Sequence, residues 1–171
     1  TGALSITTTG ETTGGTDYFG INASITNTAS TGDLTINAAT TTGGYSGIFA
    51  QNKGTGALSI TTTGTTKGTD YFGIFAYNYN SASTGDLTIV TGEFDAEGDL
   101  IKTTGGKDGI RARNYGTGAL SIKTTGTTTG TNRDGIFANN SSAGTSLTIN
   151  AATTTGGANG INAKNSGSGA L

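Results

Sequence analysis

Two short apolar patterns alternate along the whole chain, and this alternation limits the fold more than any other feature. The first is Leu-x-Ile, and its copies begin at Leu4, Leu34, Leu58, Leu87, Leu120 and Leu147, with a seventh starting at Leu171. The second is Gly-Ile-x-Ala, and its copies begin at Gly20, Gly47, Gly73, Gly109, Gly135 and Gly160. Strict internal repetition at this spacing is typical of a solenoid, in which each repeat forms one coil.

The spacing of the copies divides the chain into coils. Successive Leu-x-Ile copies lie 24 to 33 residues apart, which gives about six coils. Coils also pair into super-repeats at 1–54, 55–116 and 117–167, and the middle one is longer because of an insertion at about 90–100. We therefore treat 1–171 as a single solenoid domain. Both of its ends are expected to be uncapped, which favours a slice of a longer array or a segment that stacks end to end.

Both patterns have a period of two, which is the period of a strand with one apolar face. Helix is disfavoured because β-branched Thr and Ile dominate and no stripe with a 3.6-residue period exists. The sequence therefore predicts an all-β fold, a right-handed parallel β-helix in which the Leu, Ile and Ala of each pattern point inward. Runs of threonine at 7–9, 40–42, 61–63, 103–104, 124–125 and 153–155 are expected to form a third wall.

Composition taken alone favours disorder, because 31 of the 171 residues are Gly and only 32% are hydrophobic. The repeat outweighs this, since stacked coils satisfy the backbone through inter-coil hydrogen bonds. Composition also excludes several functions. The chain has no Cys or His, so disulfides, thiolate or imidazole metal sites and His-based catalysis are ruled out. Its net charge of -2 argues against nucleic-acid binding, and no apolar run is long enough to insert into a membrane as a helix.

An asparagine recurs shortly after the Gly-Ile-x-Ala pattern, at Asn52, Asn78, Asn114, Asn140 and Asn165. Two interpretations fit this position. Stacked side-chain amides would form a hydrogen-bonded ladder at one corner of the coil. Alternatively, Asn is simply a residue that tolerates left-handed turn geometry.

The variable residue of Gly-Ile-x-Ala points outward and includes the main candidate binding residues. Read from coil to coil, the central four positions are Phe49, Phe75, Arg111 and Phe137. An exposed column of aromatic rings and a guanidinium suits contact with another protein or a sugar ring. The alternative is that the Thr-Asp-Tyr-Phe-Gly segments at 16–20 and 69–73 fold over the column.

The insertion contains four of the eleven acidic residues, Glu93, Asp95, Glu97 and Asp99. They are a weak Ca²⁺ candidate, because Ca²⁺ takes several carboxylate oxygens, but the segment lacks a Ca-loop signature and a solvated loop is the simpler interpretation. A polysaccharide-processing β-helix enzyme would use paired carboxylates. The other acids are mostly scattered in turns, so no enzyme activity, resident metal or cofactor is expected.

Coils of the form Asp-Gly-Ile-(Phe/Arg)-Ala-(Asn/Arg)-Asn, followed by Gly-Thr-Gly-Ala-Leu-Ser-Ile, occur best at 108–126 and 134–149. They resemble the passenger repeats of bacterial autotransporter proteins, and the resemblance covers nearly the whole chain. It implies a right-handed β-helix exported across the outer membrane and located at the cell surface or released from it. A signal peptide and a C-terminal membrane barrel, both features of that family, are missing from this sequence.

These observations favour a non-enzymatic extracellular β-solenoid that acts as a structural stalk or fibre with an adhesive or self-associating face. Its expected partners are further copies, joined end to end or laterally, and a host-surface or glycan ligand. A second hypothesis is ice binding, because flat arrays of Thr hydroxyls on a solenoid organise water. The Thr runs differ in length and are interrupted by Gly and Lys, which weakens that second hypothesis.

Overall fold

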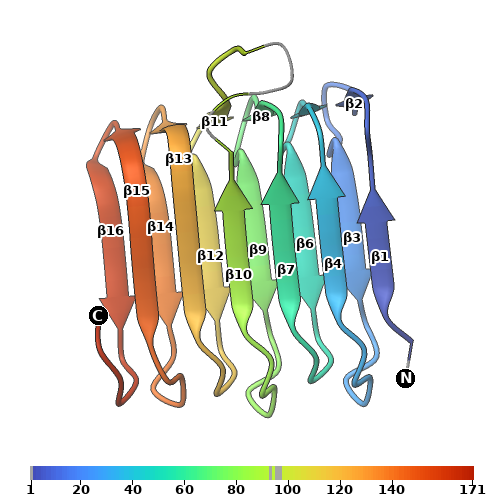
Figure 1. Cartoon of the computed structure of the whole chain (residues 1–171), viewed down its shortest axis with the longest axis vertical. Helices are drawn as coiled ribbons and strands as arrows, with labels where there is room; N and C mark the ends of the chain where they lie inside the picture. The colour runs from blue at the N-terminus through green and yellow to red at the C-terminus, as the bar shows by residue number, and fades with distance from the viewer. Residues whose placement is uncertain (1, 93, 95–97) are drawn as a thin grey trace.

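A computed structural model describes residues 2–92, 94 and 98–171. It confirms an all-β parallel solenoid of about six coils, and its described residues form no helix. Figure 1 shows the strands of successive coils side by side in two facing layers, with the first coil at one end of the stack and the last at the other. None of the described residues belongs to a helix long and apolar enough to cross a membrane.

Each coil is built from the two sequence patterns. The Leu-x-Ile pattern forms β1 (Leu4–Thr7), β4 (Leu34–Ala38), β7 (Leu58–Thr62), β10 (Leu87–Thr91), β13 (Leu120–Gly130) and β15 (Leu147–Gly156). The Gly-Ile-x-Ala pattern forms β3 (Ile21–Ile25), β6 (Ile48–Asn52), β9 (Ile74–Asn78), β12 (Ile110–Asn114), β14 (Asp134–Asn140) and β16 (Asn159–Asn165). Short strands between them are β2 (Thr12–Thr13), β5 (Thr41–Gly43), β8 (Thr66–Gly68) and β11 (Lys102–Gly105).

The strands assemble into two parallel sheets with equivalent residues in register. The first sheet has the order β1-β4-β7-β10-β13-β11-β8-β5-β2, with β15 also paired to β13, and the second has the order β16-β14-β12-β9-β6-β3. The short threonine strands belong to the first sheet, because β13 and β15 continue from the Leu-x-Ile segment into the threonine segment. They lie at the end where the chain crosses to the second sheet (Figure 1). The expected third wall is thus a continuation of the first. The six predicted threonine runs do not form one wall, because 61–63 and 124–125 align within the Leu-x-Ile strands, whereas 40–42 and 103–104 align with Thr66 in the short strands.

The hydrophobic core lies between the two sheets and consists of the predicted ladders. In the central coils Leu58, Ile60, Ile74 and their equivalents are fully buried. Identical side chains in register stack without gaps, so a thin core is densely packed. At the last coil Ile161 is 45% exposed, because it has a neighbouring coil on one side only.

The threonine strands of the first sheet pack against the glycines that begin the Gly-Ile-x-Ala pattern in the second sheet. The buried side chains of Thr66, Thr103 and Thr128 point into the solenoid. A Cβ placed on Gly47 would lie 2.8 Å from the Thr66 methyl carbon, and one on Gly109 would lie equally close to that of Thr128. Glycine therefore begins the Gly-Ile-x-Ala pattern because the facing threonine methyl takes up the space of a side chain.

Four of the five asparagines form a ladder, as one of the two interpretations predicted, whereas among the described residues Asn52 bonds only to the turn that follows it. Asn78 donates a side-chain hydrogen bond to Asn114 (3.2 Å), Asn114 donates to Asn140 (3.0 Å), and Asn140 donates to Asn165 (3.1 Å). Each also binds the turn that follows it; the Asn114 amide donates to the Gly118 carbonyl at 2.7 Å. The left-handed alternative is wrong, because no described residue other than glycine has a positive φ.

The insertion lies between β10 and β11, in the middle of the stack, on the side where the strands of the first sheet end (Figure 1). An antiparallel bridge joins Phe94 to Leu100, and both side chains are exposed. Ile101, which follows, is buried and would contact a Cβ placed on Gly92. The inserted segment is therefore attached to the solenoid through an apolar contact at its C-terminal end.

Candidate binding surface

The outer side of the second sheet, with the loops that border it, gathers nearly all the aromatic side chains, and we call it the aromatic face. It includes all six tyrosines and all but Phe94 of the six phenylalanines. The reason is local: strands β6, β9 and β14 have Phe at their outward positions, and the tyrosines mostly lie in the turns just before and after strands of the second sheet. Stacking of the coils then joins single aromatic residues into a continuous surface.

The four predicted site residues form one column on this face, in register across β6, β9, β12 and β14. The rings of Phe49 and Phe75 are stacked, with centroids 5.1 Å apart and planes 9° from parallel. Parallel stacking along the solenoid axis covers the ring faces and turns their edges outward. The ring faces of the column are therefore covered by neighbouring members of the column, and its role in binding stays a prediction.

The loops that precede the strands cover part of the column, as the alternative interpretation proposed. Phe19 lies 5.0 Å from Phe49, and Phe72 lies 5.3 Å from Phe75, measured between ring centroids. The phenylalanine of each Thr-Asp-Tyr-Phe-Gly segment thus packs beside the column, and the column rings are half-buried. These contacts remove apolar area from water and stabilise the coil.

Arg111 is held by two partners within the face. Its guanidinium donates a hydrogen bond to the carboxylate of Asp108 at 2.6 Å, and Asp108 is fully buried. Its guanidinium carbon also lies 4.3 Å from the ring centroid of Phe137, which is cation–π geometry. Arg111 is only 8% exposed, so its first role is to neutralise a buried acid.

A second row of side chains lies beside the column in the preceding turns. Tyr45 and Tyr71 stack at 3.9 Å between centroids, and the Lys107 ammonium lies 3.7 Å from the Tyr71 centroid. A side-chain hydrogen bond with Tyr71, together with burial, raises the pKa of Tyr45 above its usual value. In this row the residue is tyrosine in the second and third coils (Tyr45 and Tyr71) and lysine in the fourth (Lys107).

A cluster of three tyrosines, Tyr77, Tyr79 and Tyr115, occupies the other edge of the face, and we call it the tyrosine cluster. Tyr77 meets Tyr79 edge to face at 5.2 Å and lies 5.3 Å from Tyr115. Burial and a side-chain hydrogen bond with Tyr115 raise the pKa of Tyr77 to about 12. Tyr79 and Tyr115 remain 54% and 40% exposed. These residues are not among the binding residues predicted from the sequence, although the alternation Phe75-Ala76-Tyr77-Asn78-Tyr79 places its aromatic residues on one face.

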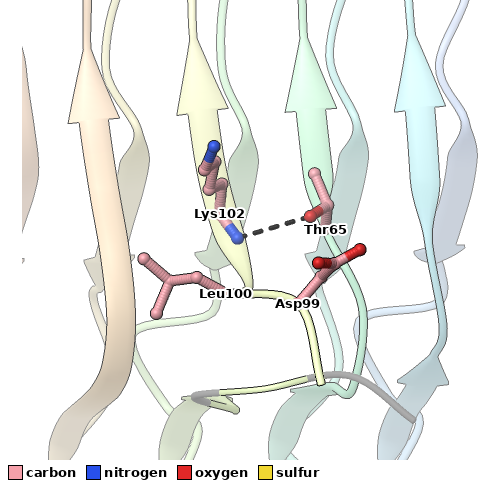
Figure 2. A pocket seen from close by; sticks show the side chains of 4 residues that line it. All are labelled: Thr65, Asp99, Leu100 and Lys102. Atoms are coloured by element: carbon pink, nitrogen blue, oxygen red, sulfur yellow. Dashed lines mark hydrogen bonds between the residues drawn. The ribbon is translucent and has the colours of Figure 1, made fainter. Parts of the chain in front are cut away.

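The acidic insertion contains the weak Ca²⁺ candidate. Glu93, Asp95 and Glu97 lie outside the described residues. Asp99 lines a pocket of about 600 Å³ together with Thr65, Leu100 and Lys102 (Figure 2). In this pocket the Lys102 backbone N–H donates to the Thr65 hydroxyl at 3.4 Å. The described part of the chain contains no group of three or more Asp or Glu side chains placed to hold a metal ion.

Comparison of the chain with family models, with curated proteins and with solved structures finds no match.

Proposed function

We propose that the chain is a non-enzymatic structural or adhesive segment of an extracellular bacterial stalk or fibre. The aromatic face is the single observation that carries this proposal. Large aromatic residues gathered on one outer surface, with Tyr79 and Tyr115 open to solvent, are typical of interaction sites. Repetition of similar coils provides the rod on which such a surface is presented.

The chemistry of the side chains supports a role without catalysis. The sequence contains no His or Cys to act as a nucleophile or general base near neutral pH. Of the buried acids, Asp108 is paired with Arg111, and Asp134 accepts hydrogen bonds from Asn159 and Asn162. Asp108 also accepts a hydrogen bond from the Asp134 N–H of the next coil at 3.0 Å, so both carboxylates are engaged in holding adjacent coils together.

Adhesion can be tested with beads coated with the purified chain and applied to an epithelial cell layer. We expect the beads to adhere, and we expect simultaneous Phe49→Ser, Phe75→Ser and Phe137→Ser substitutions to lower the adhering fraction while strand-type circular dichroism persists. A matched control replaces three outward residues of the first sheet, Thr35, Thr88 and Thr148, by Ala. Undiminished adhesion of the phenylalanine variant would remove the column from the function.

The structural part of the proposal is tested by electron microscopy of the purified chain, combined with an assay for sugar release from polysaccharides. We expect rods or filaments in which coils repeat at about 4.8 Å, joined end to end or laterally. A compact particle that cleaves a polysaccharide would overturn the proposal in favour of an enzyme.

Ice binding is a second candidate, favoured by one observation on the opposite face. An unbroken outward column of hydroxyl residues runs through the first sheet, consisting of Ser5, Thr35, Ser59, Thr88, Ser121 and Thr148. The neighbouring outward column is less regular, since it contains Val90 and Lys123. The leading proposal predicts that a concentrated sample has no gap between its melting and freezing points; a clear gap would assign the function to this hydroxyl column.

A further inference from the structure

Two rows of outward side chains run along the tyrosine-cluster edge of the aromatic face. The inner row is in strand register and consists of Gln51, Tyr77, Arg113, Asn139 and Lys164. The outer row follows the asparagine ladder and consists of Lys53, Tyr79, Tyr115, Ser141 and Ser166. In the outer row each backbone N–H donates to a carbonyl of the previous coil, which belongs to Ile25 for Lys53 and to an asparagine for the others, for example Tyr115 to the Asn78 carbonyl at 2.9 Å. The two rows are therefore held on a rigid backbone.

The aromatic rings of these rows differ from those of the phenylalanine column in what they offer to a ligand. Phe49 and Phe75 stack face to face, so their faces are covered. Tyr77 and Tyr79 meet at 82°, and Tyr79 and Tyr115 lie 6.3 Å apart with planes tilted by 46°. Because these rings are not parallel, and because Tyr79 and Tyr115 are 54% and 40% exposed, part of their ring surface remains available to a ligand.

The two rows also concentrate positive charge. They contain Lys53, Arg113 and Lys164 and no acidic residue, which gives +3 within a chain whose net charge is -2. None of these three cations forms an ion pair with an acid that the structure describes. Lys53 lies 5.9 Å from the Tyr79 ring centroid, and the Arg113 Nε is buried without a hydrogen-bond partner among the described residues. Arg111 in the phenylalanine column and Arg133 in a neighbouring turn differ, since Asp108 lies within ion-pair distance of both.

We propose that the tyrosine cluster, together with Lys53, Arg113 and Lys164, is a binding site for an anionic polysaccharide. Exposed tyrosine rings pack against the apolar side of a sugar ring, and the amides of Gln51 and Asn139 match its hydroxyl groups. A guanidinium binds carboxylate or sulfate through paired hydrogen bonds. The site would supply the adhesive contact and so rests on the function proposed above. Its surplus of positive charge selects an acidic chain over a neutral one.

The test measures binding of the purified chain to three immobilised polysaccharides: polygalacturonate, dextran sulfate and uncharged dextran. We expect binding to at least one of the two anionic polymers, weakened by added salt because exposed charges are screened, and no binding to dextran. Arg113→Gln, and separately the pair Tyr79→Ser with Tyr115→Ser, should each weaken binding by about tenfold, which corresponds to about 1.4 kcal/mol. Thermal melting checks that each variant is folded.

Two control variants match the changes in charge and in aromatic content. Lys123→Gln removes one positive charge from the outer side of the first sheet, and Phe94→Ser removes an aromatic residue that is 57% exposed and lies outside the aromatic face. Both should bind as the unmodified chain does. Equal loss of binding in Lys123→Gln and Arg113→Gln would mean that net charge alone governs binding, and it would overturn the site.

The remaining outcomes separate the site from the function. Beads that adhere to cells while the chain binds neither anionic polymer would overturn the polysaccharide site and leave adhesion standing, with a protein partner as the next candidate. Binding to dextran as strong as binding to dextran sulfate would overturn the selection for acidic chains. Failure of both cell adhesion and polysaccharide binding would overturn the adhesive function and the site together.

Discussion

Replacing Gly105 by alanine is expected to lower the free energy of unfolding by about 3 kcal/mol or more. Gly105 ends β11 at the corner where the first sheet turns toward the second. An added Cβ would lie 1.9 Å from the Asp108 carbonyl oxygen, a distance that no backbone can keep. That carbonyl accepts a hydrogen bond from the Gly73 N–H of the previous coil, so moving it also loosens the contact between coils.

The same collision repeats along the corner, which is why glycine recurs there. Four glycines pair in register at this corner: Gly43, Gly68, Gly105 and Gly130. A Cβ added to any one of them would lie 1.9 to 2.0 Å from a backbone oxygen of the segment that follows it. Because each coil contacts only its neighbours, a distorted fourth coil would separate the three coils before it from the two after it.

Urea unfolding followed by circular dichroism checks this prediction, with Gly10→Ala as the matched control. A Cβ on Gly10 meets nothing within 4 Å, and Gly10 does not have a positive φ. The control is expected to change stability by at most about 1 kcal/mol, in the stabilising direction, because alanine restricts the unfolded chain. Equal midpoints for the two variants would show that the corner is not closely packed.

Substituting Asn114 by alanine is expected to cost about 3 kcal/mol, because it removes four hydrogen bonds at a buried position. The Asn114 side chain donates to the Gly118 carbonyl and to Asn140, and it accepts from the Gly116 N–H at 3.1 Å and from Asn78 at 3.2 Å. The turn groups left behind are buried without partners, and their desolvation accounts for most of the loss.

Asn37→Ala is the control for this substitution, since Asn37 is an exposed, outward residue of β4. It should change the unfolding midpoint little, by about 0.5 kcal/mol or less. An intermediate variant, Asn114→Asp, keeps the acceptor for Gly116 and loses both donated bonds, so it should also be destabilised. If Asn114→Ala unfolds at the same urea concentration as Asn37→Ala, the ladder contributes nothing to stability.

Much of the core could be predicted from the sequence because the spacing of the repeats carries the register. Leu58 pairs with Leu87 and Ile74 with Ile110, although 29 and 36 residues separate the two members of each pair, because each pattern recurs once per coil. The period of two then decides which side chains are buried. The threonine segments were less predictable, since their lengths vary; only β13 and β15 make clear that they extend the first sheet.

The candidate binding surface was only partly predictable. The repeat predicts that four residues align in one column: Phe49, Phe75, Arg111 and Phe137. The packing of Phe19 and Phe72 beside this column depends instead on how the loops close. The pairing of Arg111 with Asp108 likewise depends on a side-chain conformation that a sequence does not specify. The exposure of Tyr79 and Tyr115 depends on the turn that follows β9 and β12, and this turn lies outside both repeated patterns.

The sequence alone determined that this chain stacks parallel coils, where the Leu-x-Ile and Gly-Ile-x-Ala strands lie and which face of them is buried, because a period-two pattern repeated once per coil allows few other arrangements. Tertiary structure decided what occupies each surface. It placed Ile25 of the first coil in register with Asn52, where later coils have asparagine, and it joined three tyrosines and three cations into one surface. The physical reason is that such groupings depend on neighbours from different coils, and those neighbours are set by loop closure and side-chain packing rather than by the repeat.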